Sequence, residues 1–93
     1  MTKYYSIMLG YTADVAPTTA AVDSLLNGAV KDWLRLNAYQ YLVATELSAE
    51  QLFAQLKPVL PFGANIIVMS VNLHDRYGWA SALIGDWIRK HAP

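Results

Sequence analysis

Three groups of polar side chains have types and spacings that could do chemistry. Asp14 closes the segment YYSIMLGYTAD and could offer a carboxylate to a metal ion. Ser70 and His74 lie at i and i+4 and could pair as a nucleophile and its base. In the run His74-Asp75-Arg76, an imidazole beside a carboxylate and a guanidinium could act as an acid, a base or an anion clamp. The elements that position these groups decide which activity is open to the chain.

None of the three groups has the spacing of a complete site. Along one strand face, at about 3.3 Å per residue, Ser70 and His74 would lie roughly 13 Å apart, too far for a hydrogen bond. Asp14 would need about two or three further donors to hold a metal, and a carboxylate in a turn usually organises the backbone. Loop charges such as Asp75 and Arg76 are usually solvated. We therefore expect no catalytic residue, with Asp14 as a minor candidate, and no cofactor or metal.

The composition describes a small apolar domain without a charge bias. The chain has 93 residues, of which 55% are hydrophobic and 15% charged, and its net charge is zero. A length well below about 150 residues predicts a single domain over 1–93, and the apolar content favours a homodimer or another protein partner. The neutral charge gives no support for nucleic acid, although a dimer could gather Lys31, Arg35 and Arg76 into a basic groove.

Several functional classes lack the residues that they need. Cysteine is absent, which excludes disulfides, thiolate metal sites and cysteine nucleophiles. The motifs GxxxxGK[ST], GxGxxG, HExxH and GxSxG do not occur. The start MTKYYSIML lacks signal-peptide features, and no apolar run approaches the roughly 18 residues of a membrane span. We expect a soluble, cytoplasmic protein with no membrane partner.

The first part of the chain is typical of a strand followed by a helix. Residues 3–11 are nearly all apolar or aromatic, as in a strand covered on both faces. Pro17 and an apolar stripe at helical spacing predict a helix over 18–31. Thr18 or Thr19 is expected to cap a free amide at its start.

The middle of the chain predicts a hairpin and a second helix. The alternating runs 32–36 and 39–46 are typical of paired strands. Ser48 and Gln51 form a capping box that starts a helix, and Pro58 ends it.

The last part predicts a strand over 65–73 and a final helix. Asp86 and Lys90 are spaced to pair on the outer side of this helix, and His91 is expected to compensate the helix dipole at the surface. The apolar face of the helix carries Ala80, Leu83, Ile84, Trp87 and Ile88.

This order of elements predicts an α+β, ferredoxin-like βαββαβ domain with an additional C-terminal helix. Right-handed crossovers give an antiparallel sheet of order 4-1-3-2, with the first two helices on one face. Asp14 and His74 then follow strands that end at opposite ends of the sheet, so they cannot share a site. The end that holds His74 lies near Lys3 and Glu46. The candidate polar cluster is therefore Glu46, His74, Asp75 and Arg76.

Four segments carry a family resemblance: KYYSIMLGY, AYQYLVATELSAEQL, NIIVMSVN and DRYGWASALIGDWIRK. The chain resembles the SinR-like proteins, small relatives of the dimeric nuclease of CRISPR adaptation, over almost its whole length. The run 43–52 and the pair Gly78-Trp79 are the most specific parts of the resemblance. It implies a ferredoxin-like dimer and, in the nuclease branch, a metal held between two aspartates, one from the first strand end of each subunit.

The expected aspartate is missing from this chain. Its position falls on Gly10, with Leu9 before it. Without a carboxylate there, a symmetric two-carboxylate metal site cannot form, and Asp14 could substitute only through a bulged or looped strand end. A glycine also lets another backbone approach closely, so we expect Gly10 to be a packing point.

The sheet face opposite the first two helices is expected to be too apolar for water. If odd-numbered residues of strands 1, 3 and 4 face these helices, the other face and the last helix supply the candidate interface: Tyr4, Met8, Gly10, Leu42, Ile66, Val68, Trp87 and Ile88. Either the last helix or a second subunit is expected to cover it. The sequence thus favours a non-catalytic homodimer acting through a protein surface. The alternative is a nucleic-acid binder or a metal-dependent endoribonuclease related to the CRISPR-adaptation nuclease.

Overall fold

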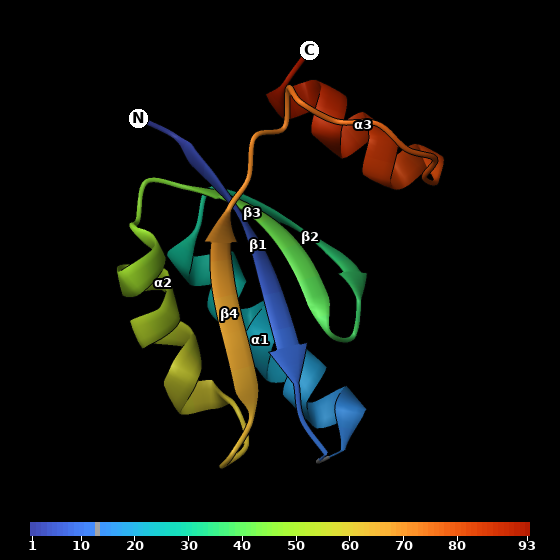
Figure 1. Cartoon of the computed structure of the whole chain (residues 1–93). Helices are drawn as coiled ribbons and strands as arrows, with labels where there is room; N and C mark the ends of the chain where they lie inside the picture. Colours follow the sequence, from blue (N-terminus) through green and yellow to red (C-terminus); the bar gives the residue numbers. More distant parts are fainter. Residues whose placement is uncertain (13) are drawn as a thin grey trace.

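In the part of the chain that the structure describes, the fold is α+β, with one antiparallel sheet and three α-helices, as a computed structural model shows (Figure 1). The structure describes residues 1–12 and 14–93. A short 3₁₀ turn, Lys57–Val59, follows the second helix. In chain order the elements are β1 (Lys3–Gly10), α1 (Val15–Ala29), β2 (Asp32–Asn37), β3 (Gln40–Thr45), α2 (Ala49–Leu56), β4 (Asn65–Ser70) and α3 (Ala82–His91).

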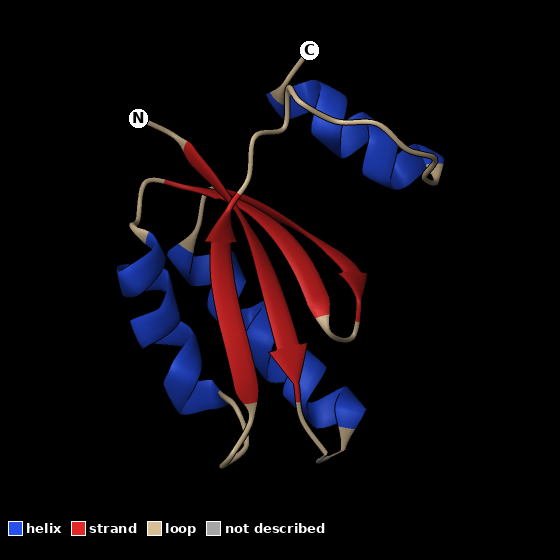
Figure 2. Ribbon diagram, in the orientation of Figure 1, coloured by secondary structure: helices blue, strands red, loops and turns tan. Residues whose placement is uncertain are grey.

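The sheet has the order β2-β3-β1-β4, which is the predicted order 4-1-3-2 counted from the other edge. Each neighbouring pair of strands is antiparallel. Helices α1 and α2 lie together on one face, and the opposite face is open over much of its length (Figure 2). This open face and the two edge strands, β2 and β4, are where a partner could bind.

Helix α1 begins earlier than its pattern predicts. It starts at Val15 instead of residue 18, so Pro17 lies in the first turn, where a missing N–H costs nothing. The expected cap by Thr18 or Thr19 is wrong, because both hydroxyls donate to carbonyl oxygens one turn back, Thr18 to Asp14 and Thr19 to Val15. Because α1 begins at Val15, both threonines lie inside the helix, and Asp14 occupies the N-cap position.

Helix α2 begins at the predicted capping box. The Ser48 hydroxyl accepts a hydrogen bond from the Gln51 backbone N–H at 3.1 Å, and the Gln51 side chain accepts one from the Ser48 N–H at 2.9 Å. The box is a local device, which explains why the sequence alone locates it correctly.

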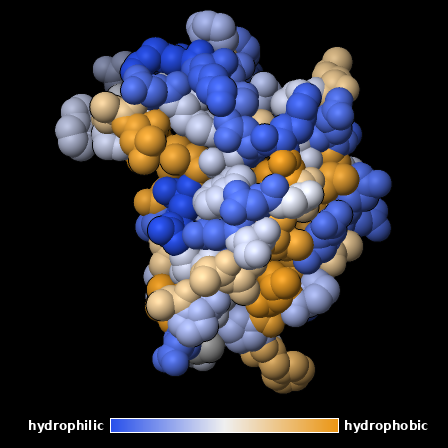
Figure 3. Space-filling model, turned by 180° about the vertical axis from the view of Figure 1, so that it is seen from behind, coloured by the Kyte–Doolittle hydropathy of each residue, from blue (hydrophilic) through white to orange (hydrophobic). Residues whose placement is uncertain are grey.

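The main core lies between the sheet and the two helices on its covered face. Its fully buried centre brings Ile7 of β1 and Tyr41 and Val43 of β3 against Leu26 of α1 and Leu52 of α2. Apolar burial of this kind is the dominant stabilising contribution in a domain of this size. From behind, hydrophobic surface is interrupted by hydrophilic side chains (Figure 3).

The predicted orientation of β4 is wrong. The antiparallel register places Ser6 opposite Met69 and Met8 opposite Ile67, so the even residues of β1 share a face with the odd residues of β4. Ile66 and Val68 consequently pack against the main core. A one-residue shift in register moves every side chain of a strand to the opposite face of the sheet. On β4, Ile67 and Met69 therefore lie on the open face in place of the predicted Ile66 and Val68.

Helix α3 covers only part of the open face. It lies at the end of the sheet where β1 begins and β4 ends, away from α1 and α2 (Figure 1). Its buried Trp87 joins a second apolar cluster with Leu34 and Ala44 of the sheet. Leu83, which the sequence pattern places on the apolar face of this helix, is 68% exposed, because the helix contacts the sheet through its C-terminal half.

The predicted strand 65–73 and the predicted ion pair of α3 both need correction. Strand β4 ends at Ser70, and the chain beyond it leads to α3. Asp86 pairs with Arg89 instead of Lys90, because the Lys90 amine reaches Asp32 of β2 at 3.1 Å. Docking of the helix on the sheet therefore overrides the local i,i+4 pattern.

Candidate functional site

Asp14, the minor catalytic candidate, lies at the start of α1. Its side chain is exposed and makes no capping hydrogen bond, while its backbone carbonyl accepts from the Thr18 hydroxyl. No group of three or more His, Asp or Glu side chains within residues 1–12 and 14–93 is arranged to hold a metal ion.

The four members of the candidate polar cluster have separate partners. Glu46 pairs with the N-terminal amine at 3.4 Å. The Arg76 guanidinium donates to the Leu73 carbonyl at 2.7 Å and to the Ala92 carbonyl at 2.9 Å. Backbone amides of His74 and Asp75 donate to Asn72. In the described chain, no hydrogen bond or ion pair joins the four side chains, so Arg76 serves to fasten the C-terminus.

Gly10 lies opposite Asn65 at the end of β1, beside a hollow of about 270 Å³. A Cβ at position 10 would lie 3.4 Å from the Asn65 amide nitrogen, an ordinary contact distance. Within this chain a side chain would fit at position 10, so a role for Gly10 as a packing point between subunits stays a prediction. The residues around the hollow carry no carboxylate in the described part of the chain: Gly10, Tyr11, Thr12, Pro61, Phe62, Gly63, Ala64 and Asn65.

A polar triad that the sequence did not indicate links α1 to the hairpin. The Asp23 carboxylate accepts from the Tyr41 hydroxyl and from the Arg35 guanidinium, each at 3.0 Å. Burial, and then the Asp23 carboxylate, raise the pKa of the Tyr41 phenol far above its usual value, so this hydroxyl stays a donor. Both carboxylate oxygens already have partners, which favours a structural role for the triad.

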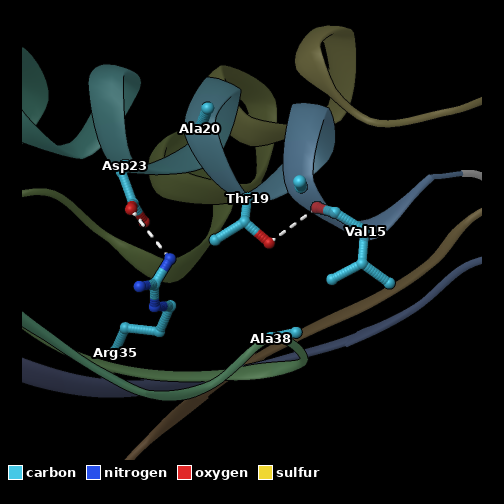
Figure 4. Close-up of a pocket in the computed structure, with 7 residues that line it drawn as sticks. Val15, Thr19, Ala20, Asp23, Arg35 and Ala38 are labelled. Atoms are coloured by element: carbon cyan, nitrogen blue, oxygen red, sulfur yellow. Dashed lines mark hydrogen bonds and ion pairs between the residues drawn. The ribbon is translucent and has the colours of Figure 1, made fainter.

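A shallow hollow of about 570 Å³ opens beside this triad, between α1 and the β2–β3 hairpin (Figure 4). Val15, Thr19 and Ala38 line one part of it, and the Asp23–Arg35 pair lies at the other (Figure 4). The Thr19 hydroxyl is used by the Val15 carbonyl. The hollow thus offers small apolar side chains and one satisfied ion pair.

An ionic contact between residues that are far apart in the sequence holds the last turn of α3 against β2. The Asp32 carboxylate lies 2.8 Å from Nε2 of His91 and 3.1 Å from the Lys90 amine. The His91 ring lies 4.3 Å, centre to centre, from the Trp87 ring and is largely buried, so its predicted surface location is wrong. Sequence patterns could not reveal this contact, because its partners are 58 and 59 residues apart.

Acid is expected to loosen α3. Burial alone would raise the pKa of Asp32, but hydrogen bonds from His91, Lys90 and the Trp33 amide hold it below its usual value of 3.8. A lowered carboxylate pKa stabilises the folded state above that usual value, and this contribution is lost as pH falls through the lowered pKa. Amide hydrogen exchange in α3 should therefore accelerate below about pH 3.8 relative to β1 and β3.

The matched variant for this acid effect is Asp32→Asn. It keeps the shape of the side chain and removes its charge, so α3 should exchange faster at neutral pH and lose most of its extra acid sensitivity. Equal acid sensitivity in both proteins would contradict the role of Asp32.

The part of the open face that α3 leaves uncovered forms an apolar surface, which we call the sheet patch: Met8, Ile67 and Met69. These side chains are 42%, 53% and 46% exposed. The neighbouring open-face side chains Ser6, Gln40 and Asn65 are neutral. The patch borders the free edge of β4, whose sequence NIIVMS has neither the charges nor the proline that usually protect an edge strand.

Of the three patch residues, only Met8 was among the interface residues predicted from the sequence. The signal for Ile67 and Met69 was present as the wholly apolar alternation Ile67, Met69, Val71 and Leu73. Without the strand register, that face could not be assigned to either side of the sheet. The other named interface residues have partners within the chain, since Tyr4, Leu42, Trp87 and Ile88 belong to the cluster beneath α3.

A second hollow, of about 560 Å³, lies between α3 and the segment that precedes it. Arg76, Arg89 and Ile88 contribute to it, together with Tyr77 and Trp79. Both of these aromatic residues are almost completely exposed. Exposed aromatic residues of this kind are typical of protein interfaces.

No helix in the described ranges is both long and apolar enough to cross a membrane. Comparison of the chain with protein-family models, curated proteins and solved structures finds no match.

Proposed function

We propose that this chain is a non-catalytic homodimer of ferredoxin-like domains that acts through a protein–protein surface. The sheet patch is the observation that carries the proposal. Met8, Ile67 and Met69 are about half exposed, on an open face whose uncovered neighbours are neutral. Burying this surface against a second subunit removes apolar side chains from water, which favours association.

The unprotected edge of β4 adds support for a partner. Six residues of this strand have one side free of any neighbouring strand, and none of them is charged. Free edges of this composition invite pairing with other chains unless something covers them. A dimer that covers the sheet patch would also restrict access to the adjoining edge.

The non-catalytic part of the proposal rests on the end of β1. The resemblance to SinR-like proteins and their nuclease relatives implies a carboxylate at position 10, where this chain has glycine opposite the amide of Asn65. A metal that activates water needs anionic or imidazole ligands, which neither residue provides. Asp14 lies beyond the strand, at the start of α1.

The nucleic-acid alternative has less support from the basic residues. Lys31 donates to the Thr2 hydroxyl, Arg35 to Asp23 and Arg76 to two backbone carbonyls. Lysine and arginine together equal aspartate and glutamate in number, at seven each. Phosphate binding relies on basic side chains in excess of their internal partners, so a protein surface is the better-supported proposal.

One protein preparation can test both parts of the proposal. Light scattering over a range of concentrations should give about twice the chain mass of 10.3 kDa. Ribonuclease assays on the same sample, with magnesium or manganese, should give no activity for the wild type or for Asp14→Ala.

Two outcomes would contradict the proposal separately. A mass of one chain at every concentration would overturn the homodimer. Metal-dependent cleavage by the wild type that Asp14→Ala abolishes would overturn the absence of catalysis and establish the endoribonuclease alternative.

A further inference from the structure

The segment 71–93, which we call the C-terminal arm, carries exposed apolar side chains of its own. Tyr77 and Trp79 are almost wholly exposed, and Leu83 is 68% exposed. The segment before α3 runs back alongside that helix, so the arm projects as a unit from one end of the sheet (Figure 1). Trp79 is 95% exposed, so this large and mainly apolar side chain has almost no contact with the rest of the chain.

Two sets of contacts fix the orientation of the C-terminal arm, and neither uses the side chains of Tyr77, Trp79 or Leu83. Arg76 ties the start of the segment to the C-terminus through the Leu73 and Ala92 carbonyls. The Asp32 contact with Lys90 and His91 ties the end of α3 to β2. A surface that is already ordered loses less conformational entropy on binding, so the arm is prepared to dock.

The sheet patch alone is too small for a stable dimer. Three half-exposed side chains supply a few hundred Å² at most, whereas a standard interface buries about 800 Å² on each partner. Tryptophan and tyrosine bury about 150–250 Å² each, so Trp79 and Tyr77, which like Phe62 are almost wholly exposed, can make up much of the difference. The dimer therefore needs more than contact between the two patches.

We propose that the C-terminal arm of one subunit docks through Trp79, Tyr77 and Leu83 on the sheet patch of a second copy, and that the two copies do so reciprocally. The inference rests on the proposed homodimer and specifies which surfaces meet in it. A two-fold axis makes the contact twice, which doubles the area that one arm provides.

The chemistry of the two surfaces is compatible. The sheet patch is apolar and bordered by the neutral amides of Gln40 and Asn65, which offer acceptors for the indole N–H of Trp79. The two arginines that line the same hollow as Tyr77 and Trp79 already have partners, since Arg89 pairs with Asp86 and Arg76 donates to two carbonyls. Docking therefore leaves neither guanidinium without a partner, which is the usual penalty for burying charge.

Cysteine cross-linking can test this arrangement cleanly, because the natural chain has no cysteine. Gly78→Cys, which keeps the neighbouring Trp79 and has open space for a side chain, and Ile67→Cys are prepared as separate single variants. They are mixed, allowed to exchange subunits and treated with a mild oxidant. Peptide mass spectrometry should then find a disulfide between positions 78 and 67, which can form only between two chains. The matched control replaces Ile67→Cys by Ser24→Cys, an exposed position on α1, and should give at least tenfold less product.

The outcomes distinguish this inference from the proposed homodimer. Dimeric mass without a 78–67 disulfide, or a dominant 67–67 disulfide in the Ile67→Cys sample alone, would overturn arm docking and leave the homodimer standing. A single-chain mass for the wild type would overturn both. Trp79→Ser gives a second measurement: it should weaken dimerisation at least tenfold with unchanged hydrogen exchange in α3, and an unchanged dimer would overturn the inference.

Discussion

Replacing Ile67 by glutamate is expected to weaken the homodimer by about two orders of magnitude or more. Ile67 is the most exposed member of the sheet patch, so the monomer should tolerate the substitution. In the dimer, the new carboxylate would be buried among apolar side chains without a partner, which costs several kcal/mol. Analytical ultracentrifugation should show a chain that remains folded and becomes mainly monomeric at concentrations where the wild type is a dimer.

The matched control for Ile67→Glu is Phe53→Glu. Phe53 is 40% exposed on α2, on the opposite side of the sheet. The substitution introduces the same charge at a similarly exposed apolar position, so the dimer should persist. If the two variants dissociate equally, the effect comes from added negative charge and the sheet patch is not the interface.

Replacing Trp87 by alanine is expected to release α3 from the sheet. Trp87 is only 8% exposed and lies in the second apolar cluster, and truncating a buried tryptophan costs about 3–5 kcal/mol. The main core lies on the other side of the sheet and does not include this residue. Hydrogen exchange should therefore accelerate sharply in α3, with much smaller changes in β1 and β3.

Trp87→Phe separates packing from hydrogen bonding at this position. Within the described residues, the indole N–H of Trp87 is buried without a hydrogen-bond partner. Phenylalanine removes that unsatisfied donor, worth about 1–3 kcal/mol, and keeps much of the ring, so it should cost less than half of the alanine loss. A loss as large as that of alanine would show that the indole N–H has a partner in solution, such as a water molecule.

Local chemistry explains which parts of the fold were predictable. The capping box at Ser48 and Gln51 and the β2–β3 hairpin depend on residues close together in the sequence, and both occur as predicted. The strand order also follows, because few topologies connect these elements with right-handed crossovers. Helix α1 began early because Pro17 fits the first turn as well as the position before it.

The candidate site was less predictable because it depends on contacts between distant segments. Arg76 could be recognised as polar, but its acceptor on Ala92 is 16 residues away and becomes a neighbour only when α3 folds back. The triad of Asp23, Arg35 and Tyr41 joins a helix to two strands and leaves no periodic signal. Such contacts depend on how elements pack, which residue type alone does not determine.

The α+β class, the strand order and the presence of a C-terminal helix could all be predicted from the sequence alone. Only the tertiary structure decided that Ile67 and Met69, instead of Ile66 and Val68, lie on the open face, and that α3 covers only one end of it. The physical reason is that alternation defines two faces of a strand without saying which one is inside. The hydrogen-bonded register with β1 makes that choice, and it thereby places the surface on which our functional proposal rests.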